Sequence, residues 1–355
     1  MTTNDFYRVA SLVQSSDYKA VFDLSGSATT VPLKRQFRLL AQHVQPETVV
    51  TSPVHDAATD VMQRLTAHYQ AAQRASQGKV DELRFTTSSG THVTTAGVAH
   101  ADMATCFLST STIDGHERSS FVKLAATTRD NDLLAAEATA LTKLATDGDP
   151  ARAMFYPQLL DSFAHLGHER LRGNVLARLD GFYNLVDVKQ AYPRGVHPLD
   201  MTWMWRRLLW ALDGAHTSGL IHGAVAPPNV MILPAGHGVV LVDWCYSLLT
   251  ATQPLRAVVG AYREWYPADS LAKAPARPGI DIVLAARTMV WLMGGEPRTG
   301  QCPGAVPAAM QTYFTDLISG RRPTNTVADV ALRFEAVLQT LGAPYFPRKF
   351  RPFSL

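Results

Sequence analysis

The feature that most constrains the fold is a change of pattern between residues 125 and 131. Residues 81–125 are rich in Thr, Ser, Val and Gly, which favours β-strands joined by turns. Residues 131–145, NDLLAAEATALTKLA, instead indicate a strong helix opened by an Asn or Asp cap. From about residue 198 the pattern is mainly helical. A sheet-rich half followed by a helix-rich half predicts an α+β fold.

Within the second half, residues 200–219 place Trp205, Leu209 and Leu212 on one helical face and stop at a glycine. Two short apolar strands over 229–244, with PAGHG between them, predict a hairpin. The other predicted elements are a strand that ends at Asp180–Gly181 and helices over 281–295 and 327–342.

The first 78 residues predict a separate small helical domain. Two amphipathic runs, 32–44 and 56–73, are expected to form a helical hairpin around a polar loop. Their apolar positions are Leu33, Phe37, Leu40, Val44, Val61, Met62, Leu65 and Tyr69. The polar stretch 72–82 marks the expected boundary, so we predict domains at 1–78 and 79–355.

Composition excludes several classes of protein. The chain has 355 residues, 46% of them hydrophobic and 18% charged, as in globular proteins. A net charge of +3 is too small and too spread out to indicate nucleic acid as the main partner. Three distant cysteines suggest neither a disulfide framework nor a zinc site. Without an apolar signal segment or a long apolar run, we expect a cytoplasmic protein that does not span a membrane.

Four segments from 79 to 355 together resemble the protein-kinase family: FVKLA at 121–125, a helix with Glu137, HGAVAPPNVMI at 222–232 and LVDWCYS at 241–247. The resemblance implies a bilobal fold, with an N-lobe over about 79–180 and a C-lobe over about 181–355. It also implies that ATP and Mg²⁺ are cofactors. By this resemblance Lys123 holds the α- and β-phosphates, Glu137 pairs with Lys123, and Asn229 and Asp243 are metal ligands.

Two alanines depart from the family pattern. Ala224 stands where the family has the aspartate that orients and deprotonates the acceptor hydroxyl, and Ala226 stands where it has a lysine. The stretch SSGTHVTTAGVA also contains Gly90 and Gly97 without forming G-x-G-x-x-G. The resemblance therefore implies a pseudokinase, with no catalytic residue, rather than an enzyme.

Further positions fit the resemblance more loosely. Asp269 in WYPAD stands where the family has the Glu of A-P-E, and Arg322 is its expected partner. Asp281 resembles the aspartate that braces the catalytic loop. We expect His222 to be a packed structural histidine, and Cys245, in place of a glycine, to be inert and to stiffen its turn.

Residues 17 to about 75 resemble a J-domain. Residues 17–47 follow without a gap the pattern in which D-Y-Y-x-V-L-G-L precedes a basic helix and His-Pro-Asp, and 61–69 resemble the third helix. In that family the turn and the basic helix engage Hsp70. Here the turn is Gln45, Pro46 and Glu47, and the basic face is Lys34, Arg35 and Arg38. The resemblance implies a degenerate J-domain that serves for docking.

Three interpretations of function stay open. The first is a nucleotide-binding pseudokinase that acts as a scaffold or regulator in a chaperone setting. The second is an active atypical protein kinase or nucleotidyltransferase, because phosphoryl transfer depends mostly on positioning and metal electrostatics. The third is a fold that binds no nucleotide. The tail FPRKFRPF, 346–353, interleaves Phe with Arg and Lys, and we expect it to tuck against the helical lobe.

Overall fold

The computed structural model describes most of the chain, and its coverage is densest after residue 82. The described residues are 3–13, 21–22, 33–44, 57–58, 61–66, 68–69, 72, 83–100, 103–166, 170–249, 253–321 and 326–355. The chain divides into two compact units, Met1–Leu83 with Thr95–Val98 and Arg84–Thr94 with Ala99–Leu355. The predicted boundary over 72–82 lies, apart from Ala72, outside the described residues. Among the described helices, none has the length and apolar character that crossing a bilayer requires.

The first unit has a hydrophobic core of its own. It contains helices α1 (Thr3–Leu12) and α3 (Leu33–Ala41). All of the predicted apolar positions contribute to this core, and the rings of Phe37 and Tyr69 stack with centroids 4.4 Å apart. Helix α1, which the sequence analysis did not predict, adds Phe6 and Val9 to the core. The turn residues Gln45, Pro46 and Glu47 lie outside the described residues.

The second unit begins with a six-stranded sheet in the order β1-β2-β3-β4-β6-β5. Its strands are β1 (Arg84–Thr86), β2 (Gly90–His100), β3 (Ala104–Ile113), β4 (His116–Ala125), β5 (Leu159–Leu166) and β6 (Leu171–Ala177). Strand β4 pairs antiparallel with both β3 and β6, and this register places Lys123 opposite Cys106 on one side and Asn174 on the other. The predicted strand near 180 ends earlier than expected, at Ala177, and a turn with a positive φ at Gly181 follows.

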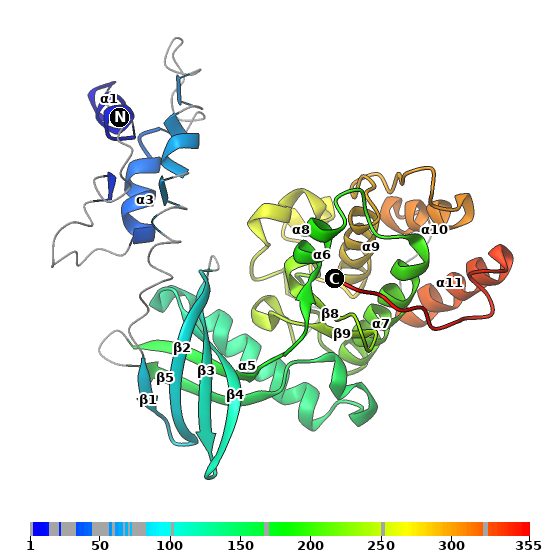
Figure 1. Cartoon of the computed structure of the whole chain (residues 1–355), viewed down its shortest axis with the longest axis horizontal. Coiled ribbons are helices and arrows are strands. Elements are labelled where there is room, and N and C mark those ends of the chain that lie inside the picture. The colour runs from blue at the N-terminus through cyan, green and yellow to red at the C-terminus, as the bar shows by residue number, and fades with distance from the viewer. Residues whose placement is uncertain are drawn as a thin grey trace. The chain divides into compact units, whose positions relative to one another are not determined.

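Helix α5 (Asn131–Thr146) packs against β6, β5 and β4 (Figure 1). The N-cap residue of this helix is an aspartate, Asp130, as predicted, but its side chain makes no bond to the first turn of α5. Instead Thr127 and Asp130 form a capping box around a short 3₁₀ turn, Thr128–Asp130, that leads into the helix.

The rest of the unit is mainly helical, as predicted. Its helices are α6 (Leu185–Ala191), α7 (Pro198–Thr217), α8 (Ala268–Leu271), α9 (Gly279–Leu292), α10 (Ala308–Ser319) and α11 (Val327–Leu341). Trp205, Leu209 and Leu212 of α7 are fully buried, which confirms the predicted face. Helix α7 packs against α9 and α11, so its buried face belongs to the helical core (Figure 1).

A small sheet lies beside these helices, with the strand order β7 (Tyr183–Asn184), β8 (Val230–Leu233) and β9 (Gly238–Leu241). Strands β8 and β9 form the predicted hairpin. The tail after α11 packs on the helical part, as expected, because Phe353 is buried and its ring stacks on Tyr192. The Tyr192 hydroxyl donates to the Ser354 carbonyl at 2.6 Å and fixes the end of the chain.

Candidate functional site

The candidate site is centred on the ammonium group of Lys123. Its Nζ donates to Glu137 Oε1 at 2.7 Å, to Asp243 Oδ1 at 2.8 Å and to Cys245 Sγ at 3.3 Å. Strand β4 supplies the lysine, α5 supplies the glutamate, and the segment after β9 supplies the other two residues. Three of the residues identified from the sequence therefore meet at one point.

The cluster is deeply buried on one side and open on the other. The side chain of Glu137 has no exposed surface and that of Lys123 is 8% exposed, whereas that of Asp243 is 28% exposed. Burial opposes the charge on Lys123, but the nearby carboxylates, Asp243 above all, hold the pKa of Lys123 well above its usual value. Burial also opposes ionisation of Asp243, yet Lys123 outweighs it and lowers the pKa of that carboxyl. Both groups are therefore charged at neutral pH.

Asn174 is part of this site, although the sequence analysis missed it. Its Nδ2 donates to Glu137 Oε2 and to the Leu134 carbonyl, both at 2.9 Å, and its Oδ1 accepts from Ser162 Oγ at 2.9 Å. Both oxygens of the Glu137 carboxylate are thus satisfied, one by Lys123 and one by Asn174. The available signal was an amide directly before the apolar residues Val175, Leu176 and Ala177 of β6, and the structure shows that this amide is fully buried.

The turn after β9 holds Asp243 in an unusual backbone conformation. Its φ of 66° and ψ of 57° lie in the left-handed region, which Asp tolerates better than most residues. Burial raises the pKa of Cys245 well above its usual range, so its thiol stays protonated. This agrees with the expectation that Cys245 is inert.

The loop that contains the two alanines is held by its backbone. Asp281 accepts from His222 N through Oδ2 and from Gly223 N through Oδ1, both at 2.8 Å. His222 is fully buried, its Nε2 bonds the Val242 carbonyl at 3.0 Å, and its Nδ1 accepts from Ala224 N at 3.2 Å. The predicted bracing role of Asp281 and the structural role of His222 are both confirmed.

Neither alanine offers a reactive group. Ala224 has no exposed surface and packs in an apolar cluster with Cys245 and Tyr246, and Ala226 is 1% exposed. A methyl group can neither accept a proton nor neutralise a phosphoryl group. The loop is therefore held by its backbone and carries no reactive side chain at these two positions.

Asn229 lies beside the cluster and is suited to a cation. Its Nδ2 donates to the Ala224 carbonyl at 2.9 Å, which fixes the amide and leaves its Oδ1 as an acceptor without a hydrogen bond among the described residues. Its own carbonyl accepts from Val242 N at 2.9 Å, next to Asp243. Amide and carboxylate oxygens are the ligands that Mg²⁺ prefers, so the donor set of Asn229 and Asp243 fits this ion.

Glu137, Asp243 and Cys245 also offer three ligand atoms within 4.8 Å of one another. The Lys123 ammonium, however, bonds all three of these groups and supplies the positive charge among them. We therefore place the candidate cation with Asn229 and Asp243 rather than in this cluster.

The remaining sequence-predicted residues lie elsewhere. Asp269 pairs with Arg277 at 2.6 Å, whereas its expected partner Arg322 lies outside the described residues. In the first unit, Arg35 and Arg38 are exposed on α3, and Lys34 beside them is partly buried and has a partner of its own. The partner roles of Lys34, Arg35 and Arg38 stay predictions. The same holds for the nucleotide and metal roles of the residues at the candidate site.

The likeness of this chain to known proteins lies mainly in its fold. No protein-family model matches the chain. Over 59 residues the chain is 41% identical to casein kinase II subunit alpha' of Saccharomyces cerevisiae, and this match spans 17% of either protein. The structure is similar to that of vaccinia related kinase 3, with a TM-score of 0.55 and 16% identity, over 78% of this chain and 98% of that chain. The chain therefore has a protein-kinase-like fold.

Proposed function

We propose that the protein is a pseudokinase that binds ATP with Mg²⁺ and acts as a nucleotide-regulated scaffold. Lys123, oriented by Glu137, would contact the phosphates, and Asn229 and Asp243 would hold the metal. The observation that carries this proposal is the separation of roles within one loop. Asn229 keeps an oriented amide oxygen, whereas Ala224 five residues earlier has lost its reactive group.

The same loop argues against transfer to a protein hydroxyl. Loss of a positioned general base costs about 10²- to 10⁴-fold in rate. Loss of a cation at the position of Ala226 removes stabilisation of the charge that develops on the phosphoryl group. Transfer by this site is therefore expected to be absent or very slow.

Thermal melting with and without nucleotide tests the binding half of the proposal. A ligand that binds only the native state stabilises it by about 2.7 kcal/mol at a hundredfold excess over Kd. We expect Mg-ATP to raise the melting temperature of the wild type and not that of Asp243→Asn, which keeps the shape of the carboxyl but not its charge. Asp269→Asn, a surface control, should respond like the wild type. An equal rise in the wild type and in Asp243→Asn would refute the assigned site.

Labelled ATP tests the catalytic half. The protein is incubated with generic protein substrates and either γ-labelled or α-labelled ATP. We expect neither label to be transferred. Transfer of γ-label that disappears in Asp243→Asn would establish an active kinase with another base. Transfer of α-label would instead establish the nucleotidyltransferase alternative.

For the first unit we propose a docking role in a chaperone setting, with an Hsp70-type protein as the candidate partner. The exposed Arg35 and Arg38 on α3 support it, because they offer a basic face on a unit with its own core. Gln45 cannot reproduce the charge state or ring of a histidine, so we expect docking without efficient stimulation of ATP hydrolysis. Single-turnover ATPase of an Hsp70 with the full chain tests this. Stimulation equal to that by an ordinary J-protein would contradict the proposal.

A further inference from the structure

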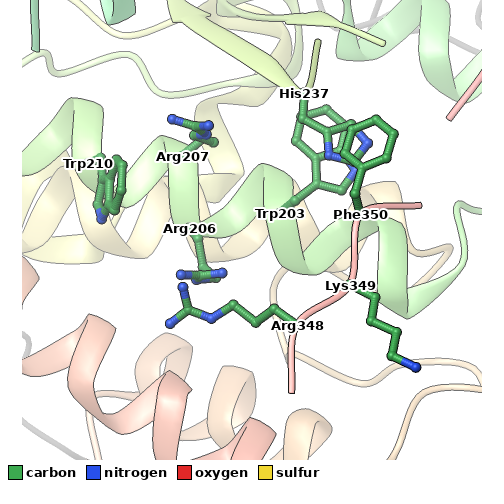
Figure 2. A pocket seen from close by; sticks show the side chains of 8 residues that line it. All are labelled: Trp203, Arg206, Arg207, Trp210, His237, Arg348, Lys349 and Phe350. Atoms are coloured by element: carbon green, nitrogen blue, oxygen red, sulfur yellow. The ribbon is translucent and has the colours of Figure 1, made fainter. Parts of the chain in front are cut away.

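A pocket of about 280 Å³ lies on the helical part of the second unit, and none of the residues of the candidate nucleotide site line it. Its lining comes from α7, from the turn between β8 and β9, and from the C-terminal tail (Figure 2). The residues are Trp203, Arg206, Arg207, Trp210, His237, Arg348, Lys349 and Phe350. Every one of them is aromatic or basic.

Helical spacing explains the α7 side of the pocket. Residues 203, 206, 207 and 210 follow the i, i+3, i+4, i+7 pattern, so they form one stripe along the helix. The opposite face of α7 carries the fully buried Trp205, Leu208 and Leu209. The aromatic and basic stripe thus faces solvent, while the opposite face of α7 lies in the core. Two tryptophans on a solvent-facing stripe are unusual.

The tail is fixed against this stripe by a stack of three rings. Trp203 and His237 are nearly parallel at 5°, with centroids 4.4 Å apart, and Phe350 stacks on His237 at 4.5 Å (Figure 2). His237 Nε2 also bonds the Arg351 carbonyl at 2.8 Å. These contacts hold Arg348 and Phe350 in place before any ligand arrives, so the pocket is preformed.

The pocket has an excess of positive charge. Glu335 of α11 pairs with Arg206 and with Arg348, each at 2.7 Å, and so offsets one of the four cations that line the pocket. Among the described residues, neither Arg207 nor Lys349 has a carboxylate within salt-bridge distance. Figure 2 shows the guanidinium groups of Arg206 and Arg348 close together and that of Arg207 apart from them, with the Lys349 ammonium directed away.

Three further observations indicate a flat anionic ligand. The guanidinium of Arg207 lies 5.3 Å from the ring centre of Trp210, which keeps its charge beside an aromatic surface. Phe350 is 70% exposed, so a ring face at the mouth of the pocket is free for stacking. The indole Nε1 of Trp203, in the wall of the pocket, is a buried donor that lacks an acceptor in the described part of the chain.

We propose that this pocket binds the side chain of a phosphotyrosine in a partner protein. A phosphate monoester carries about −1.5 to −2 charges at neutral pH, which matches the excess of cations. Guanidinium groups recognise phosphate through paired hydrogen bonds, and the ring of the ligand stacks on Phe350. The volume lies just under the range of about 300 to 1,000 Å³ for drug-sized ligands, so it suits one side chain rather than a large cofactor.

The experiment measures fluorescence anisotropy of one labelled peptide in three forms, with phosphotyrosine, phosphoserine or unmodified tyrosine, against the full-length protein. We expect the phosphotyrosine form to bind, the phosphoserine form to bind at least about tenfold more weakly, and the tyrosine form not to bind. Arg207→Ala should weaken binding of the phosphotyrosine form at least about tenfold. Phe350→Ala should weaken phosphotyrosine binding but not phosphoserine binding.

Controls separate this site from general charge attraction and from the nucleotide site. Arg277→Ala removes one exposed cation that does not line the pocket and should bind like the wild type. Asp243→Asn should also bind like the wild type. Melting curves of Arg207→Ala and Phe350→Ala confirm that both variants fold. Three results would overturn the proposal. The first is equal affinity for the phosphotyrosine and phosphoserine peptides, and the second is an effect of Arg277→Ala as large as that of Arg207→Ala. The third is displacement of the labelled peptide by AMP at a lower concentration than by unlabelled peptide.

Discussion

Replacing Lys123 by Met tests the electrostatics of the site most directly. The change removes the ammonium and keeps a chain of similar length. It leaves the Glu137 carboxylate, which has no exposed surface, with Asn174 as its remaining partner among the residues that the structure describes. Asp243 is also left without its cation, but its 28% exposure allows water to compensate. The loss should therefore come mainly from Glu137.

The expected loss in free energy of unfolding is about 3 to 5 kcal/mol, the usual cost of removing one partner of a buried ion pair. For a unit of this size that lowers the melting temperature by roughly 6 to 20 °C. The double variant Lys123→Met, Glu137→Gln removes both charges, and its amide can still accept from Asn174. It should be more stable than Lys123→Met alone, because no buried charge is left unpaired.

Tryptophan fluorescence during urea unfolding is the appropriate assay. All six tryptophans lie between residues 203 and 291, so the signal follows the second unit alone. The four proteins needed are the wild type, both single variants and the double variant. A Lys123→Met variant within about 1 kcal/mol of the wild type would refute the reasoning. The reasoning would also be refuted if the double variant lost as much free energy of unfolding as the two single variants together.

The remaining predictions concern pH and packing. Burial lowers the pKa of His222 from its usual 6.5. Below pH 6.5 the unfolded chain therefore binds a proton that the folded chain does not. As the pH falls further, the free energy of unfolding should decrease by up to about 1.4 kcal/mol per pH unit. Urea midpoints at pH 7.5 and 5.5 should differ less in His222→Gln than in the wild type; an equal difference would contradict this. In Gly173→Ala the added Cβ would lie 2.2 Å from Phe163 Cζ and 2.8 Å from Leu124 Cδ2, so we expect a loss of about 1 to 3 kcal/mol. Gly304→Ala is the matched control, because its Cβ would meet nothing within 4 Å. Equal unfolding midpoints for the two variants would contradict the predicted clash at Gly173.

Helix faces could be predicted from the sequence because periodicity reports burial directly. The buried face of α7 and the core positions of α3 follow from apolar spacing alone. The meeting of Lys123 with Asp243 could not be predicted in that way, since 120 residues separate them. That contact followed from resemblance to a family, and the fold that the comparisons support is consistent with it.

Lone polar residues inside strands were the main omissions. Asn174 is one case, and the fully buried His92 is another, with its Nε2 3.0 Å from Asp161 Oδ2 and its Nδ1 2.7 Å from Ser111 Oγ. The sequence marks neither residue as buried, and only the strand register shows which partner faces it. The pocket between α7 and the tail could not be predicted either, because these two segments are about 140 residues apart in the chain.

The bracing of the loop by Asp281 has a consequence for how such a chain changes over generations. Its bonds to His222 N and Gly223 N, and that of Asn229 to the Ala224 carbonyl, involve backbone atoms of the loop. The shape of the loop therefore does not depend on the side chains at 224 and 226. A carboxylate introduced at Ala224 would lie against Cys245 and Tyr246, where it would be buried and unpaired. The fold therefore accepts an alanine at this position easily, whereas an aspartate there requires the surrounding cluster to change as well.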